Sequence, residues 1–168
     1  MGKDIKILFA ALAFTFLLIV GFSYLMGGKN QESEQVAGSQ IEGLEINPLN
    51  YELGGVAIDG GIVTREYQLK NTTEKTLMIK KITTSCMCTL AKVVVGDKET
   101  KFFGMEHSMD KNPPVNIEIP AGETATTVVT FDPAAHGPEG KGPFERIVWL
   151  TFSDPAGIKE LKFDGEVI

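Results

Sequence analysis

The only cysteines of this 168-residue chain, Cys86 and Cys88, are separated by a single methionine. They follow an apolar run at residues 77–82. If that run is a strand that continues through the motif, successive side chains alternate between its faces, so both thiols point to one face and Met87 to the other. Neighbouring thiols can form a disulfide or bind a soft metal ion, which makes this pair the first candidate for chemistry in the chain.

A disulfide is one possibility, since two cysteines outside the cytoplasm normally pair. Closing so short a loop restricts the unfolded chain by only about 1.6 kcal/mol, so stability would not be its purpose. In an extended strand the Cα atoms of Cys86 and Cys88 would also lie near the upper limit of about 7 Å for bridging. Such a bond would be strained and easily reduced, and thiol–disulfide redox chemistry is therefore one hypothesis.

A soft metal ion is another possibility. Thiolate and thioether ligands favour Cu(I), for which two thiolates can suffice. Met105, His107 and Met109 occupy alternate positions further along the chain, so an extended segment would present all three on one side. The candidate ligands for Cu(I) are therefore Cys86, Cys88, Met105, His107 and Met109. Zinc fits less well, because its structural sites use four ligands and usually a wider cysteine spacing.

The same residues also admit purely structural roles. Free cysteines are among the most buried residue types, so the pair could belong to the core. Met105 and Met109 could fill the mouth of a sandwich, and the two histidines, His107 and His136, could be exposed loop residues. Both histidines lie in irregular stretches and no phosphate-binding loop is present, so we expect no enzyme.

A membrane segment is predicted near the N-terminus. Residues 7–26 carry no charge and are rich in Leu, Ile, Phe and Ala. At 1.5 Å per residue this run is long enough to cross a bilayer core of roughly 30 Å, and it is longer than the apolar region of a cleavable signal peptide. Lys3 and Lys6 precede it, so we expect residues 1–6 in the cytoplasm, a single transmembrane helix at 7–26 and the rest outside, in the periplasm or at the cell surface.

The remainder divides into a linker and a domain. Residues 27–43 are polar and acidic, which is typical of a solvated tether. Residues 44–168 contain short runs of β-branched and aromatic residues separated by turn signals, with no helical period. We predict an all-β, immunoglobulin-like β-sandwich of eight or nine strands with Trp149 in its core. Asn71 begins a glycosylation motif that also fits a loop, and we favour the loop. The net charge of -6 argues against nucleic acid.

Several motifs of this domain occur in a fixed order. They are Lys70-Asn71-Thr72, then Leu77, Ile79 and Ile82, then Ser85-Cys86-Met87-Cys88-Thr89, then residues 119–123 and 129–133. Together they resemble the bacterial domain-of-unknown-function family 1573 (DUF1573), which is similar to Hydin-like immunoglobulin folds. The resemblance covers most of residues 51–167 and implies a fold, an envelope location and a notable cysteine pair, without a reaction. Met87 stands where the family pattern has glycine, and residues 101–114 form a longer connection than is usual there.

Three functional hypotheses follow. The first is a membrane-anchored, non-catalytic adaptor or assembly module that binds another envelope protein through sheet edges or loops. The second is a Cu(I)-binding or copper-transfer domain that uses Cys86 and Cys88 with Met105, His107 or Met109. The third is a thiol–disulfide protein that uses the same cysteine pair.

Overall fold

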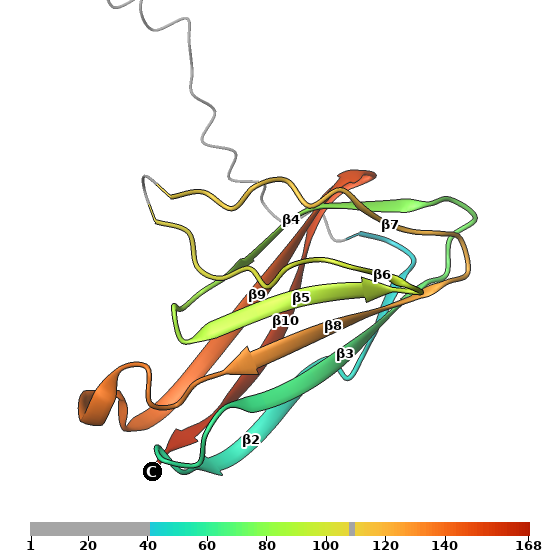
Figure 1. Cartoon of the computed structure of the whole chain (residues 1–168). Coiled ribbons are helices and arrows are strands. Elements are labelled where there is room, and N and C mark those ends of the chain that lie inside the picture. Colours follow the sequence, from blue (N-terminus) through green and yellow to red (C-terminus); the bar gives the residue numbers. More distant parts are fainter. Residues whose placement is uncertain (1–40, 108–109) are drawn as a thin grey trace, which may run out of the picture. The chain divides into compact units, whose positions relative to one another are not determined.

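The computed structural model describes residues 41–107 and 110–168. Within them the chain forms ten strands and one short 3-10 helix, η1 (Gly137–Gly140), so the all-β prediction is confirmed (Figure 1). No helix of this part of the chain has the length and apolar character needed to cross a bilayer. The predicted cytoplasmic residues, the transmembrane helix at 7–26 and most of the linker lie outside the described residues.

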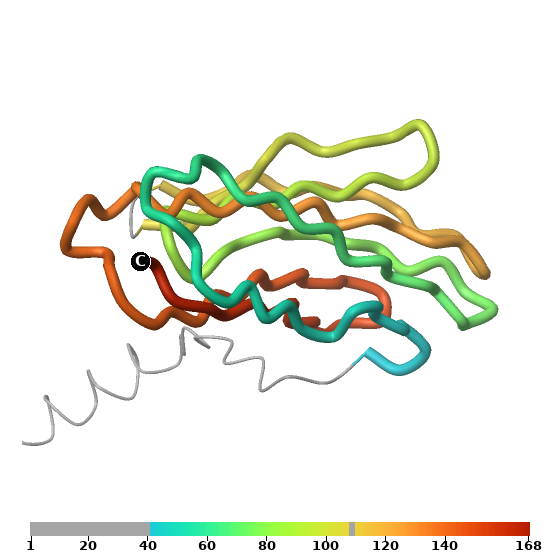
Figure 2. Tube along the Cα trace, turned by 90° about the horizontal axis from the view of Figure 1, so that it is seen from below, coloured from blue at the N-terminus to red at the C-terminus, as the bar shows by residue number. Residues whose placement is uncertain are grey.

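The strands form two sheets that lie as two layers (Figure 2). The first sheet has the order β1 (Leu44–Asn47), β3 (Val63–Asn71), β8 (Thr124–Phe131), β5 (Thr89–Val95) and β6 (Lys98–Glu99), and all its pairs are antiparallel. The second has the order β2 (Asn50–Val56), β10 (Ala156–Val167), β9 (Gly142–Asp154), β4 (Leu77–Thr84) and β7 (Ile117–Ile119). Its β2–β10 pair is parallel, and its other pairs are antiparallel.

Alternation along the strands explains why two sheets pack together. In β8 every second residue from Ala125 to Phe131 is buried, and the residues between them are half-buried. In β9 the buried set includes Val148, Leu150 and Phe152. Each sheet therefore has one apolar face, and the two faces exclude water only by packing against each other.

The position of Trp149 corrects the sequence prediction, which places this side chain in the core. It alternates with Val148 and Leu150, so it faces away from the core and is only half-buried. Its indole Nε1 donates a hydrogen bond to Glu160 Oε1 at 3.1 Å on the neighbouring strand β10. This bond and a stronger one from Lys162 lower the pKa of the Glu160 carboxyl. The period of the strand, rather than the size of the side chain, decides which face Trp149 occupies.

Asn71 joins the two sheets at one end of the sandwich. Its side chain is fully buried, and its amide Nδ2 donates to the carbonyl oxygens of Lys75, Ile119 and Pro120 at 2.8–3.0 Å. Its Oδ1 accepts bonds from the backbone N–H and the hydroxyl of Thr73. The choice of a loop over a glycosylation site agrees with this burial, because every polar atom of the amide side chain has a partner inside the protein.

The other end of the core is aromatic. Phe131 of β8 stacks on Phe144 of β9 with ring centroids 4.6 Å apart, and both contact Phe163 of β10. Tyr67 of β3 is fully buried, and its hydroxyl donates to the carbonyl of Lys162 in the opposite sheet. Burial raises the pKa of the Tyr67 phenol, so the hydroxyl keeps the proton that it donates. The layer formed by Phe131 and Phe144 lies next to the cysteine motif.

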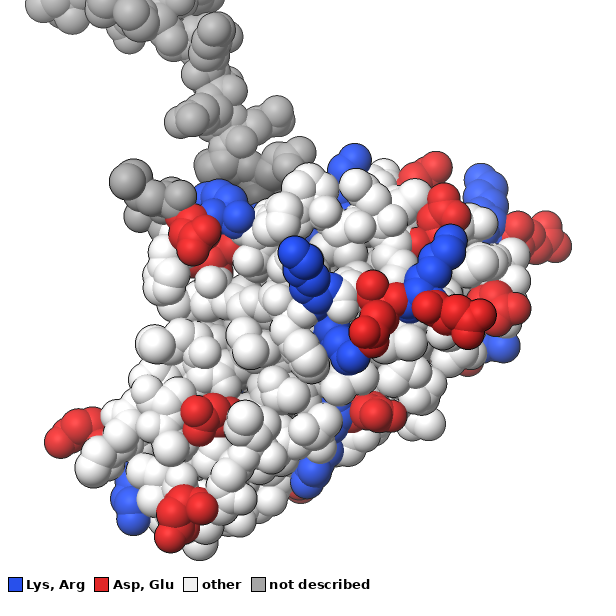
Figure 3. All heavy atoms as spheres, viewed as in Figure 1, with Lys and Arg blue, Asp and Glu red and all other residues white. Residues whose placement is uncertain are grey.

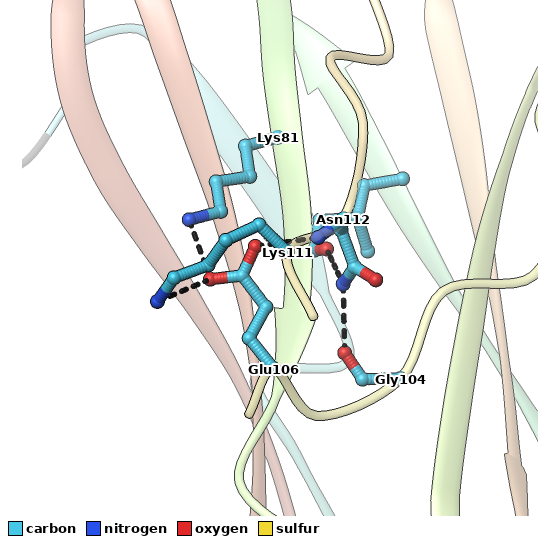
Figure 4. A network of polar contacts seen from close by, with 6 residues as sticks. Lys81, Gly104, Glu106, Lys111 and Asn112 are labelled. Atoms are coloured by element: carbon cyan, nitrogen blue, oxygen red, sulfur yellow. Dashed lines mark hydrogen bonds and ion pairs between the residues drawn. The ribbon is translucent and has the colours of Figure 1, made fainter. Parts of the chain in front are cut away.

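The long connection between β6 and β7 closes one open side of the sandwich. Phe103 pairs with Ala91 of β5 in the first sheet, while Val115 N–H donates to the carbonyl of Lys80 on β4 in the second. In between, the Asn112 amide donates to the carbonyls of Ile82 and Gly104 (Figure 4). The connection is therefore hydrogen-bonded to both sheets.

Glu106 is the centre of the polar network in this connection (Figure 4). Its side chain is 12% exposed and pairs with Lys81 at 2.7 Å, and its Oε1 accepts the backbone N–H of Asn112. Burial alone would raise the pKa of Glu106, but the bonds from Lys81 and Asn112 and the charge of Lys111 outweigh it and hold the pKa below its usual range. The carboxylate is therefore a stabilising ion at neutral pH.

Charges of both signs are mixed on the face of the molecule drawn in Figure 3. The Lys92–Glu99 ion pair, at 2.6 Å, joins β5 to β6, and Lys92 also lies over the Phe102 ring at 5.4 Å. Interspersed charges of this kind produce no large field of one sign over this face.

Candidate dithiol site at the turn between β4 and β5

The cysteine motif forms a turn and not the continuation of a strand. Strand β4 ends at Thr84, and β5 begins at Thr89. The Thr84 hydroxyl donates to the carbonyls of Cys86 and Thr89, both at 2.9 Å, and the N–H of Thr89 donates to Cys86 O. The expectation of an extended motif is therefore wrong, because a buried hydroxyl bends the backbone back at the end of β4.

The two sulfurs nevertheless lie together, joined as a disulfide. The Cα atoms of Cys86 and Cys88 are 5.3 Å apart, within the usual range for bridging, because the turn brings them closer than an extended chain would. Ser85 fixes the start of the turn: its N–H donates to Ile147 O, and its hydroxyl accepts Ile147 N–H at 2.9 Å. The turn is thus attached to β9 as well as to its own two strands.

The two sulfurs differ in their access to solvent. Cys88 is 3% exposed and belongs to the core, whereas Cys86 is half-buried and packs against the edge of the core. Met87, between them, is 60% exposed. The core interpretation therefore describes Cys88 well, while Cys86 lies within reach of a molecule approaching from outside.

His136 contacts the accessible sulfur. Its Nε2 lies 3.0 Å from Cys86 Sγ, although the two residues are 50 positions apart. His136 belongs to the loop between β8 and β9, which lies at the same end of the sandwich as the cysteine turn (Figure 1). Asp132 N–H donates to Cys88 O at 2.9 Å, and Asp132 Oδ1 accepts Ala134 N–H, so this loop is hydrogen-bonded to the turn. His136 is exposed, as the sequence interpretation expects, but the sequence does not indicate its contact with Cys86.

A close approach inside the loop constrains the backbone that carries His136. A Cβ at Gly140 would lie 2.8 Å from the Cβ of His136, so only glycine leaves room for the side chain there. The loop is thus constrained by a backbone bond at Asp132 and by the absence of a side chain at Gly140.

Arg146 contacts the buried sulfur. Its Nε donates to Cys88 Sγ at 3.2 Å, and its Nη1 donates to the carbonyl of Glu145. The guanidinium lies over the Phe144 ring, 5.5 Å from its centre, and makes a cation–π contact with this aromatic residue of the core. Partial burial lowers the pKa of Arg146, but a guanidinium stays protonated at physiological pH and brings a fixed positive charge to Cys88.

The arrangement favours the reduced, anionic form of both cysteines. A positive guanidinium beside one sulfur and a hydrogen-bonding imidazole beside the other stabilise thiolate over thiol. A disulfide whose reduced form is stabilised is a stronger oxidant and a better target for exchange. Cys86 Sγ, Cys88 Sγ and a His136 ring nitrogen also have the chemistry of metal ligands, and these three atoms lie within 4.8 Å of one another.

Of the three residues predicted from sequence as further copper ligands, the structure describes two. Met105 is half-buried and lines a hollow of about 310 Å³ next to the turn. The hollow is lined by Thr83, Thr84, Ser85, Met105, Glu106 and Trp149. His107 is exposed and pairs with Asp110 through backbone bonds, and Met109 lies outside the described residues. Whether these three bind copper stays a prediction.

Two residues of the site escape sequence reasoning. His136 and Arg146 are 50 and 58 positions from their cysteine partners. No local spacing connects them to the motif, because the pairing of strands brings them there. In the sequence, Arg146 stands two positions after Phe144, so the two side chains of a strand would share a face. This spacing indicates an aromatic neighbour for Arg146 but not a sulfur.

Fold and site together define a β-sandwich domain with a disulfide in a surface turn. Residues 44–100 match the family described as "Protein of unknown function (DUF1573)", which is the family that the sequence motifs resemble. No curated protein matches the chain.

Among solved structures, the chain is similar to a protein of unknown function from Porphyromonas gingivalis W83, with 18% identity and a TM-score of 0.53. The match covers 74% of this chain and 46% of that one, so the chain spans less than half of the other protein's length. The PapD-like domain 7 of human CEP192 is 13% identical, with a TM-score of 0.45 and coverage of 75% and 85%. The secreted serine protease VesC from Vibrio cholerae is 11% identical, with a TM-score of 0.48 and coverage of 80% and 25%. The first likeness concerns the fold alone.

Proposed function

We propose that this protein is a membrane-anchored immunoglobulin-like domain of the cell envelope that exchanges disulfides through Cys86 and Cys88. The observation that carries the proposal is that each sulfur has its own partner from a distant element, His136 for Cys86 and Arg146 for Cys88. A bond that closes so short a loop adds only about 1.6 kcal/mol to stability, so stability is not the main role of this disulfide.

The difference in burial assigns the order of events. A thiolate of the partner attacks the accessible Sγ of Cys86, and the bond between the two sulfurs breaks. The electron pair remains on Cys88 Sγ, where Arg146 stabilises the leaving thiolate. A mixed disulfide on Cys86 results. A second thiol of the partner then attacks the partner's own sulfur, releases Cys86 as a thiolate beside His136, and leaves the partner oxidised by two electrons.

The location outside the cytoplasm is part of the proposal. The uncharged run at residues 7–26 supports a membrane anchor, and the disulfide suits an oxidising compartment. The complex with the partner should then be found in the membrane fraction. If it stayed in the cytosolic fraction, the proposed location would be wrong.

The adaptor hypothesis is a second candidate with one observation in its favour. In the part of the chain that the structure describes, the second sheet ends on β2, a seven-residue strand with a free side to which another chain could add.

Disulfide exchange with a single partner, one turnover per chain, would agree with the expectation that the protein is not an enzyme. That expectation stays a prediction.

Trapping of the mixed disulfide tests the proposal. In Cys88→Ser the exchange can start only from the reverse direction, in which the Cys86 thiolate attacks the disulfide of the oxidised partner. No second thiol of this chain can then release the partner, so we expect a covalent, reductant-sensitive complex with an envelope protein to accumulate through Cys86. Cys86→Ser is the matched control, because its remaining thiol is buried and should trap several-fold less. Non-reducing electrophoresis of membrane fractions measures both.

The opposite result would contradict the proposal. Equal trapping by both variants, or none by either, would mean that Cys86 is not an exchanging sulfur. A partner that crosslinks equally to a variant with both cysteines replaced by serine would favour the adaptor function instead.

A further inference from the structure

We infer that the reduced cysteine pair, together with His136, forms a three-coordinate site for a monovalent soft metal ion, Cu(I). The inference rests on the proposed function to the extent that the disulfide must be reducible. It differs from the sequence hypothesis in its third ligand, which comes from the loop between β8 and β9 and not from residues 105–109.

The positions of the three ligand atoms fit one metal ion. Cys86 Sγ, Cys88 Sγ and a His136 ring nitrogen lie within 4.8 Å of one another. Around a metal with bonds of about 2.3 Å to sulfur and 2.0–2.1 Å to nitrogen, ligand atoms are about 3.5–4.0 Å apart. Reduction lets the two sulfurs separate toward that distance, and the imidazole already lies 3.0 Å from Cys86 Sγ. Only side-chain adjustments are then needed.

The backbone around the ligands keeps them together when the disulfide opens. The turn retains the Thr84 hydroxyl bonds to Cys86 O and Thr89 O, and the loop remains bonded to the turn through Asp132 N–H and Cys88 O. None of these bonds involves a sulfur. The site is therefore preorganised by groups that do not change on reduction.

Charge selects a monovalent ion. Two thiolates and a neutral imidazole around Cu(I) leave a net charge of about -1, which the guanidinium of Arg146 beside Cys88 neutralises. A divalent ion in the same place would give a neutral site and leave the positive charge of that guanidinium uncompensated. Zn²⁺ would also require a fourth ligand, whereas soft sulfur donors favour Cu(I).

Reduction acts as the switch for this site. A dithiol reductant transfers two electrons and two protons to Cys86 and Cys88 and itself becomes a disulfide. Cu(I) then displaces the thiol protons into solvent, and its own oxidation state does not change. In the oxidised pair each sulfur is bonded to the other, so no thiolate is available as a ligand.

The test begins with the full chain in detergent, which is reduced with a phosphine under anaerobic conditions and whose free thiols are counted. The reduced protein is then titrated with Cu(I) in competition with a chromogenic chelator. We expect one Cu(I) per chain and loss of this site in the Cys86→Ser, Cys88→Ser double variant. His136→Gln should weaken binding at least tenfold. His107→Gln, which changes the other histidine of the chain, should bind like the parent. X-ray absorption should report two sulfurs and one nitrogen, with the nitrogen lost in His136→Gln.

The outcomes separate this inference from the proposed function. Two free thiols without a tight Cu(I) site, or a site weakened by His107→Gln and not by His136→Gln, would overturn the inference and leave disulfide exchange standing. Displacement of Cu(I) by an equal concentration of Zn²⁺ would also overturn it. A Cu(I) site in a protein that forms no mixed disulfide would overturn only the exchange. A pair that resists the phosphine would overturn both.

Discussion

The two arginines of this chain provide an internal comparison at the scale of single residues. Arg65 and Arg146 each lie over an aromatic ring, Tyr51 and Phe144, at 5.8 and 5.5 Å. Each donates Nη1 to the carbonyl of the preceding residue at 2.8 Å. Arg146 additionally donates Nε to Cys88 Sγ. The difference between them therefore isolates the effect of a guanidinium on the sulfur.

Arg146→Gln should make the disulfide a weaker oxidant. Removal of the positive charge destabilises the reduced form, and a tenfold change in the equilibrium corresponds to a potential lower by about 30 mV. Arg65→Gln should leave the potential unchanged. Equilibration of each protein with a thiol redox buffer measures the shift, and an equal shift in both variants would show that Arg146 does not act through Cys88.

The sequence indicates the cysteine pair but not the two residues that contact it, His136 and Arg146. The spacing of Cys86 and Cys88 was sufficient to predict neighbouring sulfurs, whichever backbone carried them. The sequence does not indicate the turn, because the stretch is rich in residues that favour strands. The bend is held by the Thr84 hydroxyl and by the bonds between Ser85 and Ile147. His136 and Arg146 were missed because tertiary structure alone places them there.

At the scale of elements, the connection between β6 and β7 shows how an irregular segment is held. The sequence predicts an irregular insertion at residues 101–114, and the structure adds that Glu106 and Asn112 connect its two halves (Figure 4). The run of β-branched residues at 124–131 predicts a strand, and β8 has these bounds, Thr124–Phe131. Other strands extend beyond the run that the sequence indicates, because pairing with a neighbour lengthens them. Residues 145–152 predict a strand, whereas β9 begins at Gly142, opposite Val167.

Glu106 makes the stability of this connection depend on pH. Its pKa is lower in the folded chain than in the unfolded one, so its contribution is fully present above the usual carboxyl pKa of about 4.5 and is lost as the pH falls through the lower folded value. At pH 7, Glu106→Gln should lower the free energy of unfolding by about 1–2 kcal/mol. The difference between variant and parent should shrink below pH 4.5.

Denaturant unfolding at a series of pH values measures this dependence. Glu118→Gln is the matched control, because Glu118 is exposed on β7, and it should behave like the parent at neutral pH. A difference between Glu106→Gln and the parent that stays constant down to acid pH would show that the ionised carboxylate is not the stabilising group.

At the scale of the whole molecule, the order of the strands brings the site together. Strands β4 and β5 belong to different sheets, so the turn between them crosses from one layer to the other. The loop between β8 and β9 makes a second crossing at the same end (Figure 1). The all-β class and the two layers follow from composition and alternation, but the strand order and the parallel β2–β10 pair do not, because alternation indicates which face is buried and not which strand is the neighbour.

The reduction potential of the Cys86–Cys88 pair in the full chain tests the account most directly. It is obtained by equilibration with glutathione buffers of known ratio and quantification of free thiols. We predict a potential above about -230 mV, in the range of exchanging disulfides, because both thiolates have stabilising partners. A potential below about -300 mV, typical of structural disulfides, would contradict the claim that this pair exchanges electrons with another protein.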